Sequence, residues 1–244
     1  MNCRVALIQA DFEFGTLDKN LKLAEDRIVR AAENGAELVL LPESFNRGYS
    51  ICDMEQLLTW AEDEEGLTLG VMKELAKKLG IYLMAPLFLK KENGQVVNAA
   101  VLISDTGNVI GEYDKVNLVP GKEKEQVHAG TSFPVFETKF GKTGILICND
   151  LSQMEPFLAL RQAGVQLILL PAAWRYKREK PDWWDDWIKT RARDCKAAIA
   201  AVNRIGYVSE DVFYGHSRIV NSSGAIIASS EFQEDCIVAG VVEL

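Results

Sequence analysis

One thiol stands at a point where the chain could perform nucleophilic chemistry. Cys148 ends the apolar segment 144–147 and is followed by Asn149 and Asp150, two short polar residues that suit a turn. A short apolar run bounded by turn residues is typical of a buried strand. Ligands of parallel α/β sheets bind beyond the carboxyl ends of the strands, so Cys148 would lie where a ligand binds. Considered alone, such a cysteine is more often simply a buried apolar side chain.

Three charged residues also follow expected strands. Glu43 comes after Pro42 at the exit of strand 37–41, Lys115 follows strand 109–113, and Glu123 lies in the next loop. Individually, Glu43 could cap a turn, and the other two could simply be solvated. Together with Cys148 they supply what thiol catalysis requires. A carboxylate can accept the thiol proton, and an ammonium group can stabilise an oxyanion.

The hydrophobic pattern predicts a β-α-β unit that occurs twice. The first unit comprises strand 5–10, helix 17–32 ended by Gly35, and strand 37–41; the second comprises strand 143–148, helix 156–163 capped by Gly164, and strand 166–170 stopped by Pro171. The segments 35–42 and 164–171 are alike in sequence, which indicates two pseudo-symmetric halves.

Further elements complete the expected architecture. The remaining predictions are helix 67–79, strands 81–89, 96–103 and 109–113, a helix opened by Pro181 and Asp182 that runs to about residue 198, and short strands near 199–203, 217–221, 225–229 and 237–242. Turn residues at 92–94 and 105–107 favour hairpins between the middle strands. We therefore expect the α/β class: a four-layer α-β-β-α sandwich with pseudo-two-fold halves, in a single domain that spans residues 1–244.

Composition excludes several classes of function. The formal net charge of -8 does not favour binding to the phosphates of nucleic acid. No apolar run is long enough for a membrane span. The chain has five cysteines and no CxxC pair, and its N-terminus does not resemble a signal peptide. Both observations favour reduced thiols in the cytoplasm. The two histidines lack metal-ligand spacing, and the Gly141-Lys142-Thr143 segment lacks the rest of a phosphate loop. We expect no metal and no cofactor.

The chain resembles the nitrilase (carbon–nitrogen hydrolase) superfamily, in its amidase/carbamoylase-like branch. The resemblance is carried, in the family's order, by residues 40–43 (LLPE), 111–118 (GEYDKVNL), 144–150 (GILICND), 201–206 (AVNRIG) and 214–224 (YGHSRIVNSSG). It implies the α-β-β-α fold and a triad of Glu43 as base, Lys115 as oxyanion partner and Cys148 as nucleophile. The backbone N–H of Asn149 would assist Lys115. A second glutamate of the family corresponds to Glu123, with Glu125 as the alternative.

The implied activity is that of a thiol amidohydrolase acting on a small linear amide. Cys148 would form a thioester, ammonia or an amine would leave, and water would release a carboxylic acid. The charge of Lys115 would also favour the ionised form of Cys148. The alternatives are hydrolysis of an N-carbamoyl compound, nitrile hydrolysis, and a catalytically silent homologue that serves as a binding or scaffold protein.

The pocket is where the chain departs from the family. Asn149 stands where an aromatic residue is usual, so the pocket wall should be smaller and more polar. Trp174 would line the pocket, as in relatives, or belong to the core. Arg175 could clamp a substrate carboxylate, or could simply be solvated. The tryptophans at 183, 184 and 187 suit a core or a subunit interface, and the resemblance implies a homodimer or larger homo-oligomer.

Overall fold

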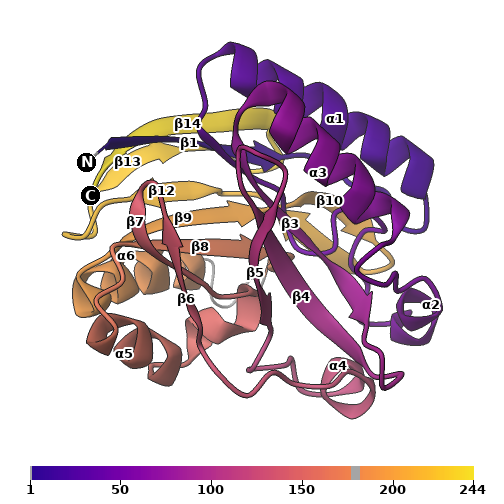
Figure 1. Cartoon of the computed structure of the whole chain (residues 1–244). Coiled ribbons are helices and arrows are strands. Elements are labelled where there is room, and N and C mark those ends of the chain that lie inside the picture. Colours follow the sequence, from indigo (N-terminus) through magenta and orange to yellow (C-terminus); the bar gives the residue numbers. More distant parts are fainter. Residues whose placement is uncertain (1, 177–181) are drawn as a thin grey trace.

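Two six-stranded sheets form the centre of the protein, in a computed structural model that describes residues 2–176 and 182–244 (Figure 1). The first sheet has the strand order β14-β1-β2-β3-β4-β5, with β1 Asn2–Gln9, β2 Leu38–Leu40, β3 Tyr82–Lys90, β4 Val96–Ile103, β5 Val109–Asp114 and β14 Cys236–Glu243. The second has the order β13-β12-β9-β8-β7-β6, with β6 Val135–Thr138, β7 Gly141–Ile145, β8 Leu167–Ala172, β9 Ala198–Asn203, β12 Arg218–Val220 and β13 Ile226–Ser229. A separate hairpin consists of β10 Ile205–Val208 and β11 Asp211–Tyr214.

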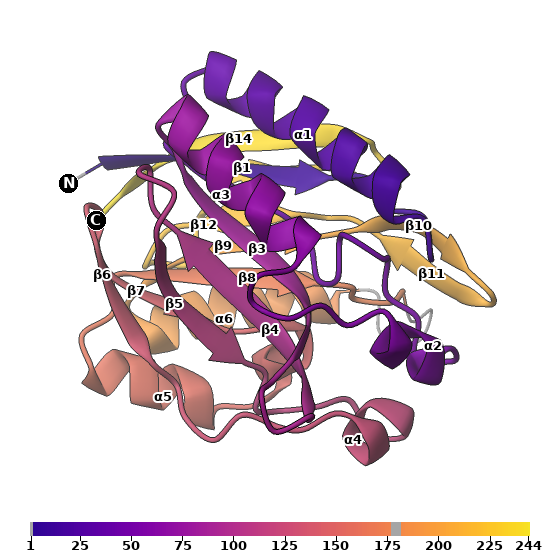
Figure 2. The ribbon, with the colours of Figure 1, turned by 45° about the vertical axis from the view of Figure 1, so that its right-hand side comes forward.

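Helices cover the outer face of each sheet (Figures 1 and 2). The helices are α1 Leu17–Glu33 and α3 Leu67–Leu79 over the first sheet, α5 Glu155–Gln162 and α6 Trp183–Cys195 over the second, and the short α2 Met54–Thr59, α4 Lys122–Gln126 and 3-10 helix η1 Cys148–Ser152. The apolar stripe of α1, which includes Ala24 and Ile28, packs on Ile8 and Val39 of the first sheet. The inner faces of the two sheets share another core. This confirms the predicted α-β-β-α sandwich.

The two halves repeat one topology, as the sequence pattern predicted. Strands β1, β2 and β3 are parallel, with α1 and α3 in their connections, and β4 and β5 continue the sheet antiparallel. Strands β7, β8 and β9, helices α5 and α6, and strands β12 and β13 follow the same plan. An antiparallel edge strand completes each sheet: β14 beside β1, and β6 beside β7.

Several strand boundaries differ from prediction, and two of the differences lie near Cys148. Strand β8 continues through Pro171, which pairs with Val202 of β9. The Leu169 carbonyl accepts from the Leu146 N–H. Because backbone groups two residues apart in a strand point the same way, the nitrogen of Pro171 points towards β7, as the Leu169 carbonyl does. Strand β7 has already ended at Ile145, so the missing N–H of Pro171 costs no hydrogen bond between strands. Conversely, β7 ends three residues before Cys148, because the chain turns there into η1.

Other differences concern short elements. Strands β6, β10 and β11 and helices α2 and α4 were not predicted, and α6 ends at Cys195 rather than near residue 198. Pro181, expected to open that helix, lies outside the described residues. None of the helices that the structure describes combines the length and apolarity needed to cross a membrane.

Candidate active site

Strand ends from both sheets bring the four candidate residues together. Glu43 lies three residues beyond β2, Lys115 directly follows β5, and Cys148 opens η1 beyond β7. Glu123 lies on α4, a short helix where a loop was expected. The side chains of Glu43, Lys115 and Glu123 have no exposed surface, and Cys148 is 5% exposed. Charged groups are buried at this level only when they are paired, so their partners determine what the site can do.

Lys115 connects the two buried carboxylates. Its Nζ lies 2.9 Å from Oε1 of Glu43 and 2.9 and 3.1 Å from the two oxygens of Glu123. Asn98 of β4 donates from Nδ2 to Oε1 of each glutamate, at 2.8 Å in both cases. Backbone N–H groups bind the remaining oxygens: Ala173 donates to Glu43 at 2.9 Å and Val119 to Glu123 at 2.6 Å. These bonds fix both carboxylates.

The charges of the cluster determine the protonation of Lys115 and Cys148. Burial lowers the pKa of Lys115, but the charges of Glu123 and Glu43 outweigh it and raise that pKa well above its usual value, so the group remains an ammonium. Burial and then the charge of Glu43 raise the pKa of Cys148 well above its usual value, although Lys115 opposes them. Lys115 does favour the ionised form of Cys148, as predicted, but burial and Glu43 outweigh it, so the resting thiol keeps its proton. Glu43 lies close enough to the thiol to raise its pKa and is placed to accept its proton.

Backbone strain at Cys148 is held by a neighbouring carboxylate. Cys148 has φ of 46°, in the left-handed region, which costs a non-glycine residue about 1–3 kcal/mol. Asp150 accepts hydrogen bonds from the Ile147 N–H at 2.8 Å, from the Tyr113 hydroxyl at 2.7 Å, and from the backbone and side chain of Asn117 at 2.9 Å each. Asp150 thus joins the turn at Cys148 to the end of β5, next to Lys115.

Cys148 faces a cavity of about 80 Å³. Its lining residues are Tyr49, Val119, Cys148, Asn149, Ala173, Trp174 and Arg175. The structure therefore brings the three predicted pocket residues to the thiol. Asn149 donates from Nδ2 to the carbonyls of Asn117 and Leu118, at 3.1 and 3.3 Å. Arg175 pairs through Nη1 with Oδ1 of Asp211 at 3.0 Å, so it is neither simply solvated nor unpaired.

The tryptophan cluster supports the pocket wall. The ring of Trp174 lies 5.5 Å from that of Trp184 and 5.8 Å from that of Trp187, and Trp183 stacks on Trp187 at 4.9 Å. Trp184 is buried and donates from its indole nitrogen to the His216 carbonyl at 2.7 Å. Trp174 thus lines the pocket and also packs on α6.

Two residues of the site were not identified from the sequence, and burial distinguishes the two candidate glutamates. Glu125 is exposed, whereas Glu123 binds Lys115. Asn98 was missed, although a lone polar residue inside the apolar run 96–103 was a usable signal. Tyr49, in the loop after Glu43, offered none.

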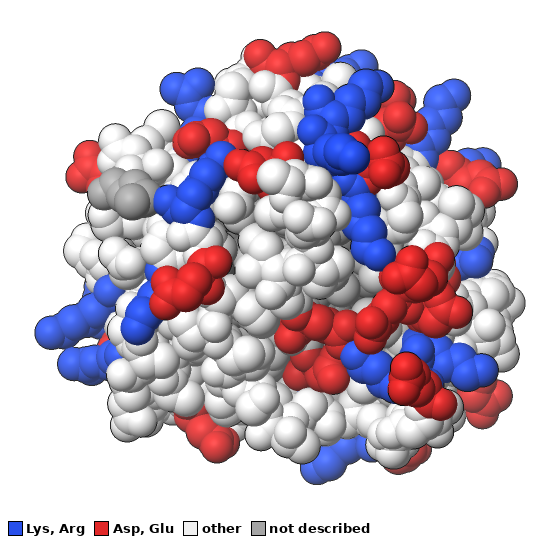
Figure 3. Space-filling view, viewed as in Figure 1, with Lys and Arg blue, Asp and Glu red and all other residues white. Residues whose placement is uncertain are grey.

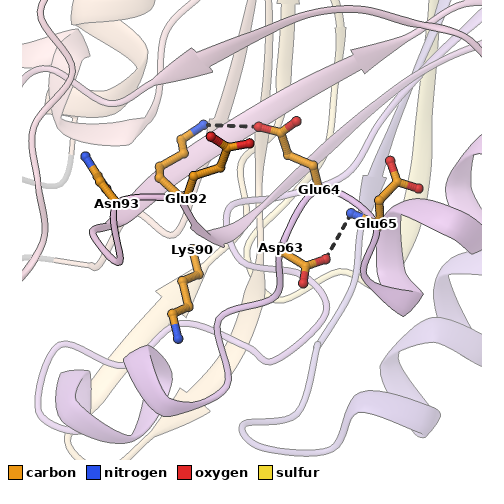
Figure 4. Close-up of a pocket in the computed structure, with 7 residues that line it drawn as sticks. Asp63, Glu64, Glu65, Lys90, Glu92 and Asn93 are labelled. Carbon is orange, nitrogen blue, oxygen red and sulfur yellow. Dashed lines mark hydrogen bonds and ion pairs between the residues drawn. The ribbon is translucent and has the colours of Figure 1, made fainter.

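A larger cavity lacks the chemistry of the candidate site. It measures about 850 Å³ and is lined by Asp63, Glu64, Glu65, Lys90, Lys91, Glu92 and Asn93 (Figure 4). Figure 3 shows acidic side chains gathered on the lower right of the face in view. No lining residue of that cavity carries a thiol or a hydroxyl group. Within the described residues, no cluster of His, Cys, Asp and Glu is placed to hold a metal ion.

Comparison with known proteins identifies the class that this fold and site define. Residues 4–242 match the family model described as "Carbon-nitrogen hydrolase". The chain belongs to the carbon–nitrogen hydrolase family, as its sequence motifs predicted.

Similar proteins include several amidases. The omega-amidase NIT2-B of Xenopus laevis is 30% identical over 235 residues, which cover 91% of this chain and 82% of that protein. The 2-oxoglutaramate amidase of Bacillus subtilis is 27% identical, and the alignment covers 99% of this chain and 91% of that protein. A solved amidase structure from Nesterenkonia has a TM-score of 0.89 at 27% identity and covers 99% of this chain and 92% of that one. Another structure of that amidase, a mutant, carries acrylamide added at its active-site cysteine.

These findings confirm the predicted enzyme class. The protein is a hydrolase of carbon–nitrogen bonds other than peptide bonds, and the predicted thiol amidohydrolase is the activity supported. The carbamoyl, nitrile and silent-scaffold alternatives are not favoured.

Proposed function

We propose that the protein hydrolyses the terminal amide of a short, linear carboxylic acid, with Glu43, Lys115 and Cys148 as its catalytic residues and Glu123 as their assistant. The observation that carries this proposal is the buried arrangement itself. Lys115 lies 2.9 Å from each glutamate, and Glu43 lies near Cys148, the only thiol that lines the cavity, and raises its pKa. A base, a nucleophile and a cation thus meet at one point.

The reaction follows from these contacts. Glu43 takes the Sγ proton while sulfur attacks the amide carbon, and the oxyanion is stabilised by Lys115 and the N–H of Asn149. The protonated Glu43 gives its proton to the departing nitrogen, ammonia leaves, and a thioester remains on Cys148. Glu43 then deprotonates a water molecule that attacks the thioester. The acid leaves, and the thiol recovers its proton.

Arg175 and the names of the relatives support an acidic amide as substrate. The similar proteins from Xenopus laevis and Bacillus subtilis are an omega-amidase and a 2-oxoglutaramate amidase. Arg175 places a guanidinium on the wall of the cavity that contains Cys148, and a guanidinium binds a carboxylate through two parallel hydrogen bonds. A panel of omega-amide acids, N-carbamoyl acids and neutral amides, assayed for ammonia release, tests this assignment. Equal turnover of neutral and acidic amides would contradict it.

Replacing Arg175 with alanine is expected to raise KM for acidic amides by about 10- to 100-fold, because a charge-assisted bond to the substrate is lost. KM for a neutral amide of equal length should change far less. Asp211→Asn is the matched control, since it removes the ion pair at 3.0 Å but keeps the guanidinium. Steady-state ammonia release measures both. An equal rise for both kinds of amide would exclude the carboxylate contact.

Replacing Glu43 with glutamine is expected to stop turnover and yet leave Cys148 open to alkylation at lower pH. The charge of Glu43 raises the pKa of Cys148, while Lys115 lowers it. With the carboxylate gone, that pKa falls, so the thiolate forms at lower pH. Mass spectrometry after iodoacetamide treatment at several pH values measures the midpoint, and the exposed Cys52 serves as the internal reference. A midpoint that stays in place or rises would refute this electrostatic account.

We also propose that the enzyme works in the cytoplasm as a homodimer or larger homo-oligomer. Five free cysteines, three of them buried, suit a reducing compartment. Leu158, on the outer helix α5, is 45% exposed, as an apolar residue at a subunit contact would be in the isolated chain. Light scattering of the purified protein measures the mass, and a monomer at micromolar concentration would contradict the assembly.

A further inference from the structure

Tyr49 is a pocket residue that the proposed reaction does not use. It lies in the loop after Glu43, is 3% exposed, and lines the cavity together with Cys148 and Arg175. Its ring stacks on Phe88 of β3, at 6.5 Å between centroids, and the Nζ of Lys115 lies 5.9 Å from the ring centre. The ring is therefore fixed on both sides, which holds the hydroxyl in a defined place.

The Tyr49 hydroxyl is buried without a partner. Among the residues that the structure describes, none hydrogen-bonds to it. Buried polar atoms are nearly always hydrogen-bonded, because an unmet donor is costly. The other phenol of the site, Tyr113, obeys this rule through its 2.7 Å bond to Asp150. A lone buried hydroxyl on the wall of a substrate cavity is placed to bind the substrate.

The hydroxyl acts as a donor near Arg175. Burial, then the charge of Glu123, raises the pKa of Tyr49 well above its usual value, so the phenol keeps its proton. Burial lowers the pKa of Arg175, and its bond to Asp211 raises it. Tyr49 and Cys148 also raise this pKa, which indicates that the three side chains lie near one another. In the described part of the chain Asp211 is the only ion-pair partner of Arg175, and it engages Nη1 alone. The guanidinium therefore has further donors for an anion.

We propose that Tyr49 and Arg175 form one anion subsite, in which the Tyr49 hydroxyl donates to the substrate carboxylate that the Arg175 guanidinium also binds. Tyr49 then sets the preference for acidic over neutral amides. This inference rests on the proposed function and adds to it a specificity-determining residue. The chemistry required of the ligand is a carboxylate within a few carbon atoms of the amide, because the cavity is small.

Tyr49→Phe tests the subsite, since phenylalanine keeps the ring that stacks on Phe88 and removes only the hydroxyl. The measured quantity is the ratio of kcat/KM for succinamate to that for butyramide, an acidic and a neutral amide of equal chain length. A hydrogen bond to a charged group predicts that this ratio falls by at least about tenfold, mostly through KM. In an Arg175→Ala background the same substitution should lower it by less than about threefold, because both residues bind one carboxylate.

Binding without turnover provides the second measurement. Calorimetry with succinate, on Cys148→Ala and on Cys148→Ala/Tyr49→Phe, should show a Kd at least about tenfold weaker in the double variant. An unchanged ratio and Kd, or effects of Tyr49→Phe and Arg175→Ala that simply add, would overturn the shared subsite while leaving the amidase intact. A wild-type enzyme without a preference for succinamate would overturn the acidic substrate and this inference together.

Discussion

Replacing Cys148 with alanine is expected to lower ammonia release by at least about 10⁴-fold, with the fold retained. The proposed route passes through a thioester on this sulfur, and loss of the nucleophile leaves only the binding and charge stabilisation of the site. Of the seven residues around the cavity, Cys148 is the only thiol. The substitution removes one sulfur atom and leaves the bonds of Asp150 to the turn in place. Steady-state ammonia release and thermal unfolding measure the two effects.

Cys52→Ala is the control for this prediction. Cys52 is exposed and does not line the cavity, so its removal should leave the rate within about twofold. The thioester itself is tested by quenching the wild-type enzyme with acid during turnover and measuring its mass by mass spectrometry. The protein should gain the mass of the acyl group. Residual activity of Cys148→Ala at a tenth of the wild-type rate, or comparable loss in Cys52→Ala, would exclude Cys148 as the nucleophile.

Replacing Lys115 with methionine is expected to weaken both the enzyme and its fold. Methionine fills a similar space but removes the cation that lies 2.9 Å from both Glu43 and Glu123. Two carboxylates without exposed surface then lack their counter-charge. The free energy of unfolding should fall by about 3–5 kcal/mol, as when one partner of a buried ion pair is removed. The loss of an oxyanion partner should lower kcat by about 10²- to 10³-fold.

A second substitution separates these effects. Lys115→Met combined with Glu123→Gln removes one of the unpaired charges, so part of the lost stability should return, whereas activity should not. Urea unfolding and ammonia release of the single and double variants measure this. A single variant as stable as the wild type would exclude the stabilising role of Lys115, and a double variant with restored turnover would exclude its catalytic role.

The sequence was most informative where local patterns and tertiary structure agree. Helix 67–79 and strand 96–103 were placed with the bounds that the structure has, because apolar periodicity and the Asn93-Gly94 turn mark them. Pro171 was misread as a strand end, since its missing N–H is harmless only when the neighbouring strand has already stopped. That condition is a property of the sheet, and a single segment cannot reveal it.

In the site, too, residues beside predicted elements could be anticipated from the sequence, and residues defined by long-range contacts could not. Glu43, Lys115, Glu123 and Cys148 follow or adjoin predicted elements and resemble family motifs, so their meeting could be anticipated. Tyr49 lies in an irregular loop, where nothing local marks a function, and the lone polar Asn98 in strand β4 was a signal that did not reveal its partners. Their importance comes from contacts with residues distant in sequence: Asn98 binds Glu43, 55 residues away. Such contacts depend on which segments the tertiary structure brings together, here strand β4 and the loop after β2, and are not encoded in any short motif.

The pairing of β1 with β14 has a consequence for biosynthesis. Asn2 pairs with Glu243, and the ladder continues to Gln9 and Cys236. A nascent chain therefore leaves one edge of β1 open until residues 236–243 have been synthesised, whereas β2, on the other side, is available early. An open strand edge is a site of unwanted pairing. Until β14 is synthesised, this edge of the first sheet is available for pairing with other strands.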